Sequence, residues 1–212
     1  MIDYIIKGGI IMIPILFCSV IALAITLERF YFLRGSRIHP PEFVGKMKKV
    51  LNEGKVQEAI AICSHNIWPI AKIMEAGILK REQPREQIKE AIEHAGKKES
   101  DKLYRYLAVL STIAIISPLL GLLGTVTGMI KVFQVISIQG VGHPTALAAG
   151  ISEALITTAA GLVVAIPTLV VHNYFLKKAN AYILEMESTS MELLDILEER
   201  IGLHHEPVRG KR

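Results

Sequence analysis

Charge is what this sequence lacks over long stretches. Only 21% of its 212 residues are charged, 51% are hydrophobic, and the mean hydropathy is +0.40. Soluble globular domains usually carry about a quarter charged residues. The deficit is concentrated in three runs, 8–27, 106–130 and 154–176, which contain no Asp, Glu, Lys or Arg. This distribution excludes an ordinary soluble domain and indicates a membrane protein.

The three uncharged runs are 20, 25 and 23 residues long. At a helical rise of about 1.5 Å per residue, each can cross a hydrocarbon core of roughly 30 Å. Lipid offers no partner to an unpaired backbone amide, so helices are expected. We predict an all-α integral membrane protein with three transmembrane helices.

Cysteine and the usual catalytic motifs are also scarce. Cys18 lies in the first hydrophobic run and Cys63 in the polar middle of the chain, so the two should lie in different compartments and form no disulfide. The sequence contains no HExxH motif, no phosphate-binding loop ending in Gly-Lys-Ser/Thr and no paired acid–base constellation. We therefore expect neither an enzyme nor a cofactor or metal site.

The first hydrophobic run raises the question of a cleaved signal peptide, because Lys7 precedes it and Ala22 and Ala24 lie near its end. However, its apolar part exceeds the roughly 7–15 residues of a signal-peptide core. Charged residues follow directly, and aromatic residues at 30–32 come next. That order is typical of an interfacial aromatic belt, so we interpret the run as a membrane anchor.

Basic residues predict the topology. The segment 34–105 holds 15 of the 24 Lys and Arg residues, whereas 132–152 holds none. Lys and Arg are retained on the cytoplasmic side of a membrane, and without interleaved aromatic residues they do not suggest a nucleic-acid surface. The predicted organisation is a periplasmic N-terminus and first transmembrane helix at 1–33, a cytoplasmic helical segment at 34–105, a second transmembrane helix at 106–135, a short periplasmic loop at 136–149, a third transmembrane helix at 150–176, and a cytoplasmic C-terminal helix and tail at 177–212.

The polar middle segment has helical periodicity. Apolar residues recur at helical spacing over 43–51 and again over 56–63, with a turn signal at 52–54 between them. Pro69 and Pro84 fall where helices are expected to begin.

The second and third spans are expected to extend into the cytoplasm. Between Pro84 and Lys131 the only strong helix breaker is Pro118, so the second span should continue a cytoplasmic helix with a kink at Pro118. Apolar residues at helical spacing carry the third span on to Ile201, and the tail 204–212 should be disordered.

Small residues form stripes on the last two spans. Gly121, Gly124 and Gly128 share one helix face, and Gly161 lies in a row of small residues on the third span. Such stripes allow membrane helices to approach closely, so helix packing is the expected role of these glycines. The Thr125 hydroxyl either bonds a carbonyl of its own helix or faces a polar cavity.

Glu153 is the only charged residue between Lys131 and Lys177. An unpaired charge at mid-bilayer costs about 2.5–3.5 kcal/mol or more, so Glu153 must face a bundle interior, a watery cavity or the interface. An interfacial carboxylate that offsets the helix dipole is one interpretation. The hydroxyls of Thr157 and Thr158 on the same helix favour the other, an ion pathway.

Two segments carry a family resemblance. LLGLLGTVTGMI (119–130) and GISEALITTAAGLVVAIPTLVVHNYF (150–175) resemble the signature segments of the MotA/TolQ/ExbB proton channel family. The first span, ALAITLERFYFLR (22–34), is similar to the first helix of that family. The resemblance covers nearly the whole chain, and three spans resemble the ExbB type, with TolQ as the alternative, rather than the four-span flagellar type.

The resemblance implies a homopentameric ring in the bacterial inner membrane around an ExbD- or TolR-like partner, which brings one transmembrane helix with an essential aspartate. The energy released by proton flow would be transferred to a TonB- or TolA-like protein. The pore threonines and glutamate of the family fall on Thr125, Thr158 and Glu153, and Lys131 departs from the family pattern. One carboxylate is too few for a proton relay, so the threonine hydroxyls would hold water and receive the partner's aspartate. The competing functions are a TolQ-like subunit for envelope maintenance and a passive, non-conducting membrane scaffold.

Overall fold

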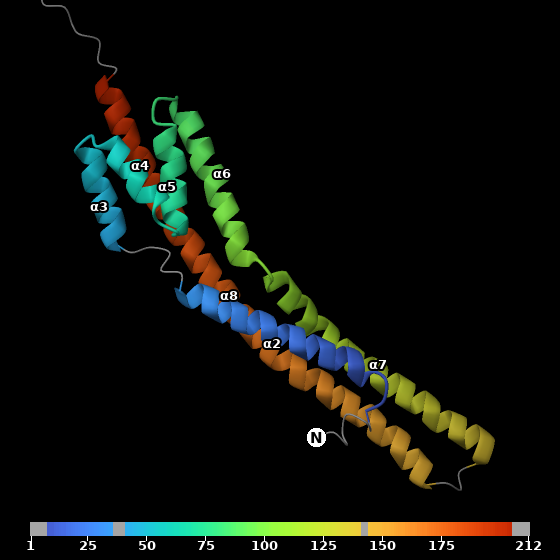
Figure 1. Ribbon diagram of the computed structural model, residues 1–212. Coiled ribbons are helices and arrows are strands. Elements are labelled where there is room, and N and C mark those ends of the chain that lie inside the picture. The colour runs from blue at the N-terminus through green and yellow to red at the C-terminus, as the bar shows by residue number, and fades with distance from the viewer. Residues whose placement is uncertain (1–7, 36–40, 141–143, 205–212) are drawn as a thin grey trace, which may run out of the picture. The chain divides into compact units, whose positions relative to one another are not determined.

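The computed structural model describes residues 8–35, 41–140 and 144–204, and every regular element in these ranges is a helix (Figure 1). The helices are α2 (Met12–Gly35), α3 (Pro41–Asn52), α4 (Val56–Ser64), α5 (Pro69–Leu79), α6 (Arg85–Tyr104), α7 (Leu107–Gln139) and α8 (Pro144–His204). The chain divides into two compact units, which we call the membrane unit (1–31 and 106–176) and the polar unit (32–105 and 177–212).

Three helices within the described ranges are long and apolar enough to cross a membrane. They fall within 12–33, 85–138 and 147–197, and these ranges contain the second and third uncharged runs of the sequence and most of the first. The prediction of an all-helical, multi-pass membrane protein is confirmed. The side of the membrane on which each segment lies, and the segment boundaries drawn from it, stay predictions.

The membrane unit consists of α2, α7 and the first part of α8. Helices α7 and α8 run side by side and are joined by a short connection (Figure 1). At its beginning α2 approaches α8, because a Cβ added at Gly8 would lie 3.3 Å from the side chain of Ile156. At its other end, the guanidinium of Arg29 lies 5.5 Å from the ring centroid of Tyr106, just before α7.

The polar unit consists of α3 to α6 and the last part of α8. The helices predicted over 43–51 and 56–63 are confirmed as α3 and α4, and Gly54 makes the turn between them at φ 77°. Pro69 begins α5 and Pro84 directly precedes α6, as predicted. A T-shaped contact of Phe43 and Trp68, with ring centroids 5.1 Å apart, joins α3 to the start of α5.

One expectation about helix continuity is wrong. The helix predicted from Pro84 through Lys131 is interrupted at Arg105 and Tyr106, between α6 and α7. Tyr106 has φ 63°, a left-handed conformation that a non-glycine residue rarely adopts and that ends a helix.

The expected continuation of the third span is confirmed, because α8 runs without interruption to His204. Pro118 lies inside α7, and a second proline, Pro167, lies inside α8. The tail expected to be disordered lies outside the described residues, apart from His204.

Candidate functional site

Small residues bring α7 and α8 into close contact. A Cβ added at Gly121 would lie 3.0 Å from the Cα of the facing residue, and one at Gly128 only 2.8 Å from a facing Cβ. Substitution at any of the four glycines predicted from the sequence would therefore push the helices apart. The nearest facing residues are Thr158 for Gly121, Thr157 for Gly124, Ala154 for Gly128 and Ser117 for Gly161.

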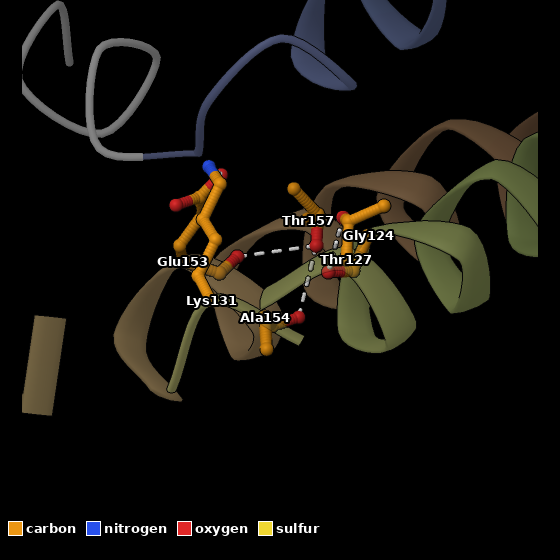
Figure 2. Close-up of polar contacts among 6 residues, drawn as sticks. All are labelled: Gly124, Thr127, Lys131, Glu153, Ala154 and Thr157. Atoms are coloured by element: carbon orange, nitrogen blue, oxygen red, sulfur yellow. Dashed lines mark hydrogen bonds and ion pairs between the residues drawn. The ribbon is translucent and has the colours of Figure 1, made fainter. Parts of the chain in front are cut away.

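Thr157 is fully buried in this contact, against Gly124. Its hydroxyl donates to the backbone carbonyls of Glu153 at 3.1 Å and Ala154 at 2.9 Å on its own helix (Figure 2). The hydroxyl of Thr127 likewise donates to the carbonyl of Gly124 at 3.1 Å (Figure 2). These two hydroxyls satisfy their hydrogen-bonding needs locally, so Thr157 serves the helix contact in this chain.

Thr158 and Thr125 are both half-buried but use their hydroxyls differently. Thr158 Oγ1 donates to the carbonyl of Gly121 at 3.0 Å and so ties α8 to α7. Thr125 Oγ1 donates to the carbonyl of Leu122 at 2.6 Å on its own helix, which is the first of the two alternatives left by the sequence. The structure therefore brings Thr158 and Thr125 to the same helix pair without a direct hydrogen bond between them among the described contacts.

Glu153 forms an ion pair with Lys131, with Nζ 2.5 Å from Oε1 (Figure 2). The Glu153 side chain is 16% exposed, whereas the Lys131 side chain is 54% exposed. The two residues are the only charged residues between 106 and 176. The pair joins α7 to α8 and neutralises the one carboxylate of the two spans.

Sequence reasoning missed this pair, although a signal was present. Lys131 lies shortly before the connection between the spans and Glu153 shortly after it, at similar distances from it. Antiparallel helices bring such positions to the same level, and two lone opposite charges in apolar surroundings are expected to pair.

A cavity of about 450 Å³ lies beside the ion pair. Both charged side chains line it, together with small and hydroxyl-bearing residues near the beginning of α8. A Cβ added at Gly9 would collide with Glu153 Oε1, so the chain before α2 packs closely against the ion pair. The remaining lining residues of the cavity are Val135, Thr145, Ala149, Gly150 and Ser152.

The contact between α7 and α8 combines an ion pair, hydroxyl groups and a cavity within otherwise apolar spans. Over the described ranges no group of three or more His, Cys, Asp or Glu residues could hold a metal ion. The helix pair contains a neutralised carboxylate and the half-buried hydroxyls of Thr125 and Thr158. The cavity is large enough for several water molecules, because a water molecule occupies about 30 Å³ in the liquid.

Comparison with known proteins gives a consistent result. The model of the MotA/TolQ/ExbB proton channel family matches residues 66–188. A putative biopolymer transport protein, ExbB-like 1, from Synechocystis sp. is 38% identical over 81% of this chain and 68% of its own length. A putative ExbB homolog from Methanothermobacter thermautotrophicus is 31% identical over 79% of this chain and 60% of its own length. The structure of MotAB from C. jejuni is similar in fold alone, with a TM-score of 0.58 and 17% identity over 91% of this chain and 76% of that chain.

Proposed function

Because the chain belongs to the MotA/TolQ/ExbB proton channel family and is most like its ExbB members, we propose that it is the proton-conducting subunit of an energy-transducing motor in the bacterial inner membrane. It would use the proton motive force together with an ExbD-like partner that crosses the membrane once. The work would pass to a TonB-like protein and drive active transport across the outer membrane. This is a channel function, and it requires no enzyme activity.

The main support for the proposal is that the contact between α7 and α8 is polar, although both helices belong to apolar spans. Thr158 bridges α8 to α7 through Gly121, and the Lys131–Glu153 pair lies on the same two helices. A single, already paired carboxylate cannot relay protons by itself. A second acid from a partner helix would complete the pathway, and half-buried hydroxyls such as that of Thr125 would receive it or its water.

The assembly follows from the same reasoning. Hydroxyls on α7 and α8 can surround a partner helix only if several copies of the chain enclose it. The resemblance to the family implies five copies, so we propose a homopentamer around the single-span partner. Protonation of the partner's carboxylate would allow it to pass the apolar wall between neighbouring copies, and the threonines would be its docking points.

Thr158→Val tests the proposal, because it keeps the side-chain shape and removes the hydroxyl. In proteoliposomes that contain the complex of the chain with its single-span partner, we expect proton flux to fall about fivefold to tenfold, the rate equivalent of one hydrogen bond of about 1 kcal/mol. Thr168→Val is the matched control, since the Thr168 hydroxyl donates to the Val164 carbonyl at 2.7 Å within its own helix. Its flux should equal that of the wild type.

The same experiment separates a channel from a scaffold. A scaffold would hold the partner and keep its activity in both variants, with no flux that depends on the Thr158 hydroxyl. If Thr158→Val left the complex and its proton flux at the wild-type level, the hydroxyl role would be wrong. A complex that assembled but passed no protons in the wild type or in either variant would support the scaffold function instead.

A further inference from the structure

We propose that Lys131 determines the ion selectivity of this chain, by occupying the one carboxylate of its second and third spans, at which a sodium ion would otherwise bind. The inference rests on the proposed channel function and adds the residue that would restrict conduction to protons.

The first argument is the occupancy of Glu153. Its Oε1 atom lies 2.5 Å from Lys131 Nζ, and there is no other acidic residue between 106 and 176. Cation pathways commonly bind their ions through rings of acidic side chains or of carbonyl oxygens that replace the hydration shell. A sodium ion that reached this level would find the carboxylate already neutralised by an ammonium group.

The second argument is the position of the ammonium relative to the cavity. Lys131 and Glu153 both line the cavity of about 450 Å³, and the Lys131 side chain is 54% exposed while Glu153 is 16% exposed. The positive end of the pair is therefore the more accessible one. A second cation in the cavity would be repelled by Lys131 before it approached Glu153.

The third argument is depth. Lys131 lies eight residues before the end of α7 at Gln139, and Glu153 lies nine residues after the beginning of α8 at Pro144. At about 1.5 Å per residue, the pair lies roughly 12–14 Å from the helix ends. The Glu153 side chain is only 16% exposed at this level, and a partly buried charge is screened less by salt and water than a surface charge.

A proton does not meet the same obstacle, because it needs no coordination shell. It can move along water and hydroxyl groups, which both donate and accept hydrogen bonds. The half-buried hydroxyls of Thr125 and Thr158 lie five or six residues from the ion pair along the two helices, deeper in the spans. Lys131 would therefore exclude sodium while it leaves this hydrogen-bonded route open.

The test measures sodium and proton flux side by side, with ion-sensitive dyes, in proteoliposomes that contain the complex of the chain with its partner. The wild type is expected to pass protons and not sodium. Lys131→Gln releases the Glu153 carboxylate, so sodium flux should rise about tenfold or more above the wild-type level, the effect of uncovering one charge. Lys131→Arg keeps the positive charge and should restore the wild-type selectivity.

A double variant separates selectivity from structural support. Lys131→Gln combined with Glu153→Gln keeps the neutrality of the site but removes the only carboxylate that this chain offers there, so the gain in sodium flux should disappear. If the ion pair only stabilised the helices, Lys131→Gln would lower the amount of complex and its proton flux without any gain in sodium flux, and the inference would be overturned.

Two further results also decide the matter. Sodium flux through the wild-type complex would overturn the role of Lys131 while leaving a channel function in place. A wild-type complex that passed neither ion would contradict the proposed function itself, and this inference with it.

Discussion

Thr157 and Thr158 show at the scale of single residues how one step along a helix decides the use of a hydroxyl. Neighbouring positions on an α-helix are about 100° apart. Thr157 consequently faces Gly124 and is fully buried, whereas Thr158 is half-buried and reaches the carbonyl of Gly121. Of the two, only Thr158 retains the exposure that a group needs in order to meet water or a partner's carboxylate.

Cys63 illustrates a different effect of burial, in the polar unit. Its thiol is fully buried in α4, and burial, with a smaller contribution from the negative charge of Glu75, raises the pKa of Cys63 from 9.0 to about 12. The thiol of the unfolded chain ionises at the lower value. Between these two pKa values the folded state binds one more proton than the unfolded state, so stability falls as the pH rises through this window.

Cys63→Ala is therefore expected to flatten the loss of stability above pH 9.0. In the wild-type chain this thiol should shift the folding equilibrium by up to about tenfold per pH unit within the window. Thermal unfolding of the full chain in detergent, followed by circular dichroism on both sides of pH 9.0, measures the difference. Cys18→Ala is the control and should keep the contribution of Cys63. An equal slope in the wild type and in Cys63→Ala would contradict this account.

At the scale of elements, the contact of α7 with α8 depends on the absence of side chains. Four glycines place backbone against backbone or against a threonine, and the cross-helix hydrogen bond from Thr158 to Gly121 requires that closeness. Association of membrane helices relies on such packing, because lipid provides no hydrophobic driving force between them.

Gly124→Ala should separate the two helices, because the new methyl group would occupy the space of the Thr157 hydroxyl. We expect a loss of about 1–3 kcal/mol from overpacking, partly offset by about 1 kcal/mol of helix propensity. Gly45→Ala in α3 is the control, since a Cβ there meets nothing within 4 Å. It should stabilise the chain by about 0.5–1 kcal/mol. Thermal unfolding in detergent measures both, and equal behaviour of the two variants would contradict the close contact.

The helices themselves could be predicted from the sequence, whereas the break between α6 and α7 could not. Each of these helices is indicated by residues within it or next to it: an uncharged run, apolar residues at helical spacing, or a proline at 69 or 84. The structure contains the corresponding helices. The break contains Arg105 and Tyr106 but neither glycine nor proline. Tyr106, the left-handed residue of this break, contacts Arg29, which is distant in the sequence. No local sequence pattern therefore indicates the break.

The ion pair at the candidate site could not be predicted for the same reason. The composition of the third span singled out Glu153, the hydroxyls of Thr125, Thr157 and Thr158 were noted on the same two spans, and the family resemblance then matched Thr125 and Thr158 to pore threonines. The partner of Glu153 depends on the register between α7 and α8, which the small-residue stripes leave undefined. Lys131 was visible in the sequence as a departure from the family pattern, but its meaning required the 2.5 Å contact with Glu153.

At the scale of the whole molecule, the two units differ in what their surfaces expose. The membrane unit exposes many large apolar side chains, as lipid-facing helices do. The polar unit, predicted to lie in water, nevertheless exposes Leu184 to 66% and Met191 to 63%. These residues are seven apart in α8 and so lie on one helix face, which we call the apolar stripe. Exposed apolar patches in water commonly mark an interface, and another copy of the chain in the proposed ring would cover this one.

Leu184→Glu combined with Met191→Glu is expected to weaken self-association without unfolding the chain, since both side chains already contact solvent. Burying two carboxylates against an apolar neighbour would disfavour the assembled state strongly. Native mass spectrometry of the detergent-solubilised chain should show smaller assemblies, while circular dichroism keeps its helical signal. Lys46→Glu in α3 changes the net charge equally at another exposed position and should leave the assembly intact. An unchanged assembly in the double variant would place the apolar stripe outside the contacts between copies.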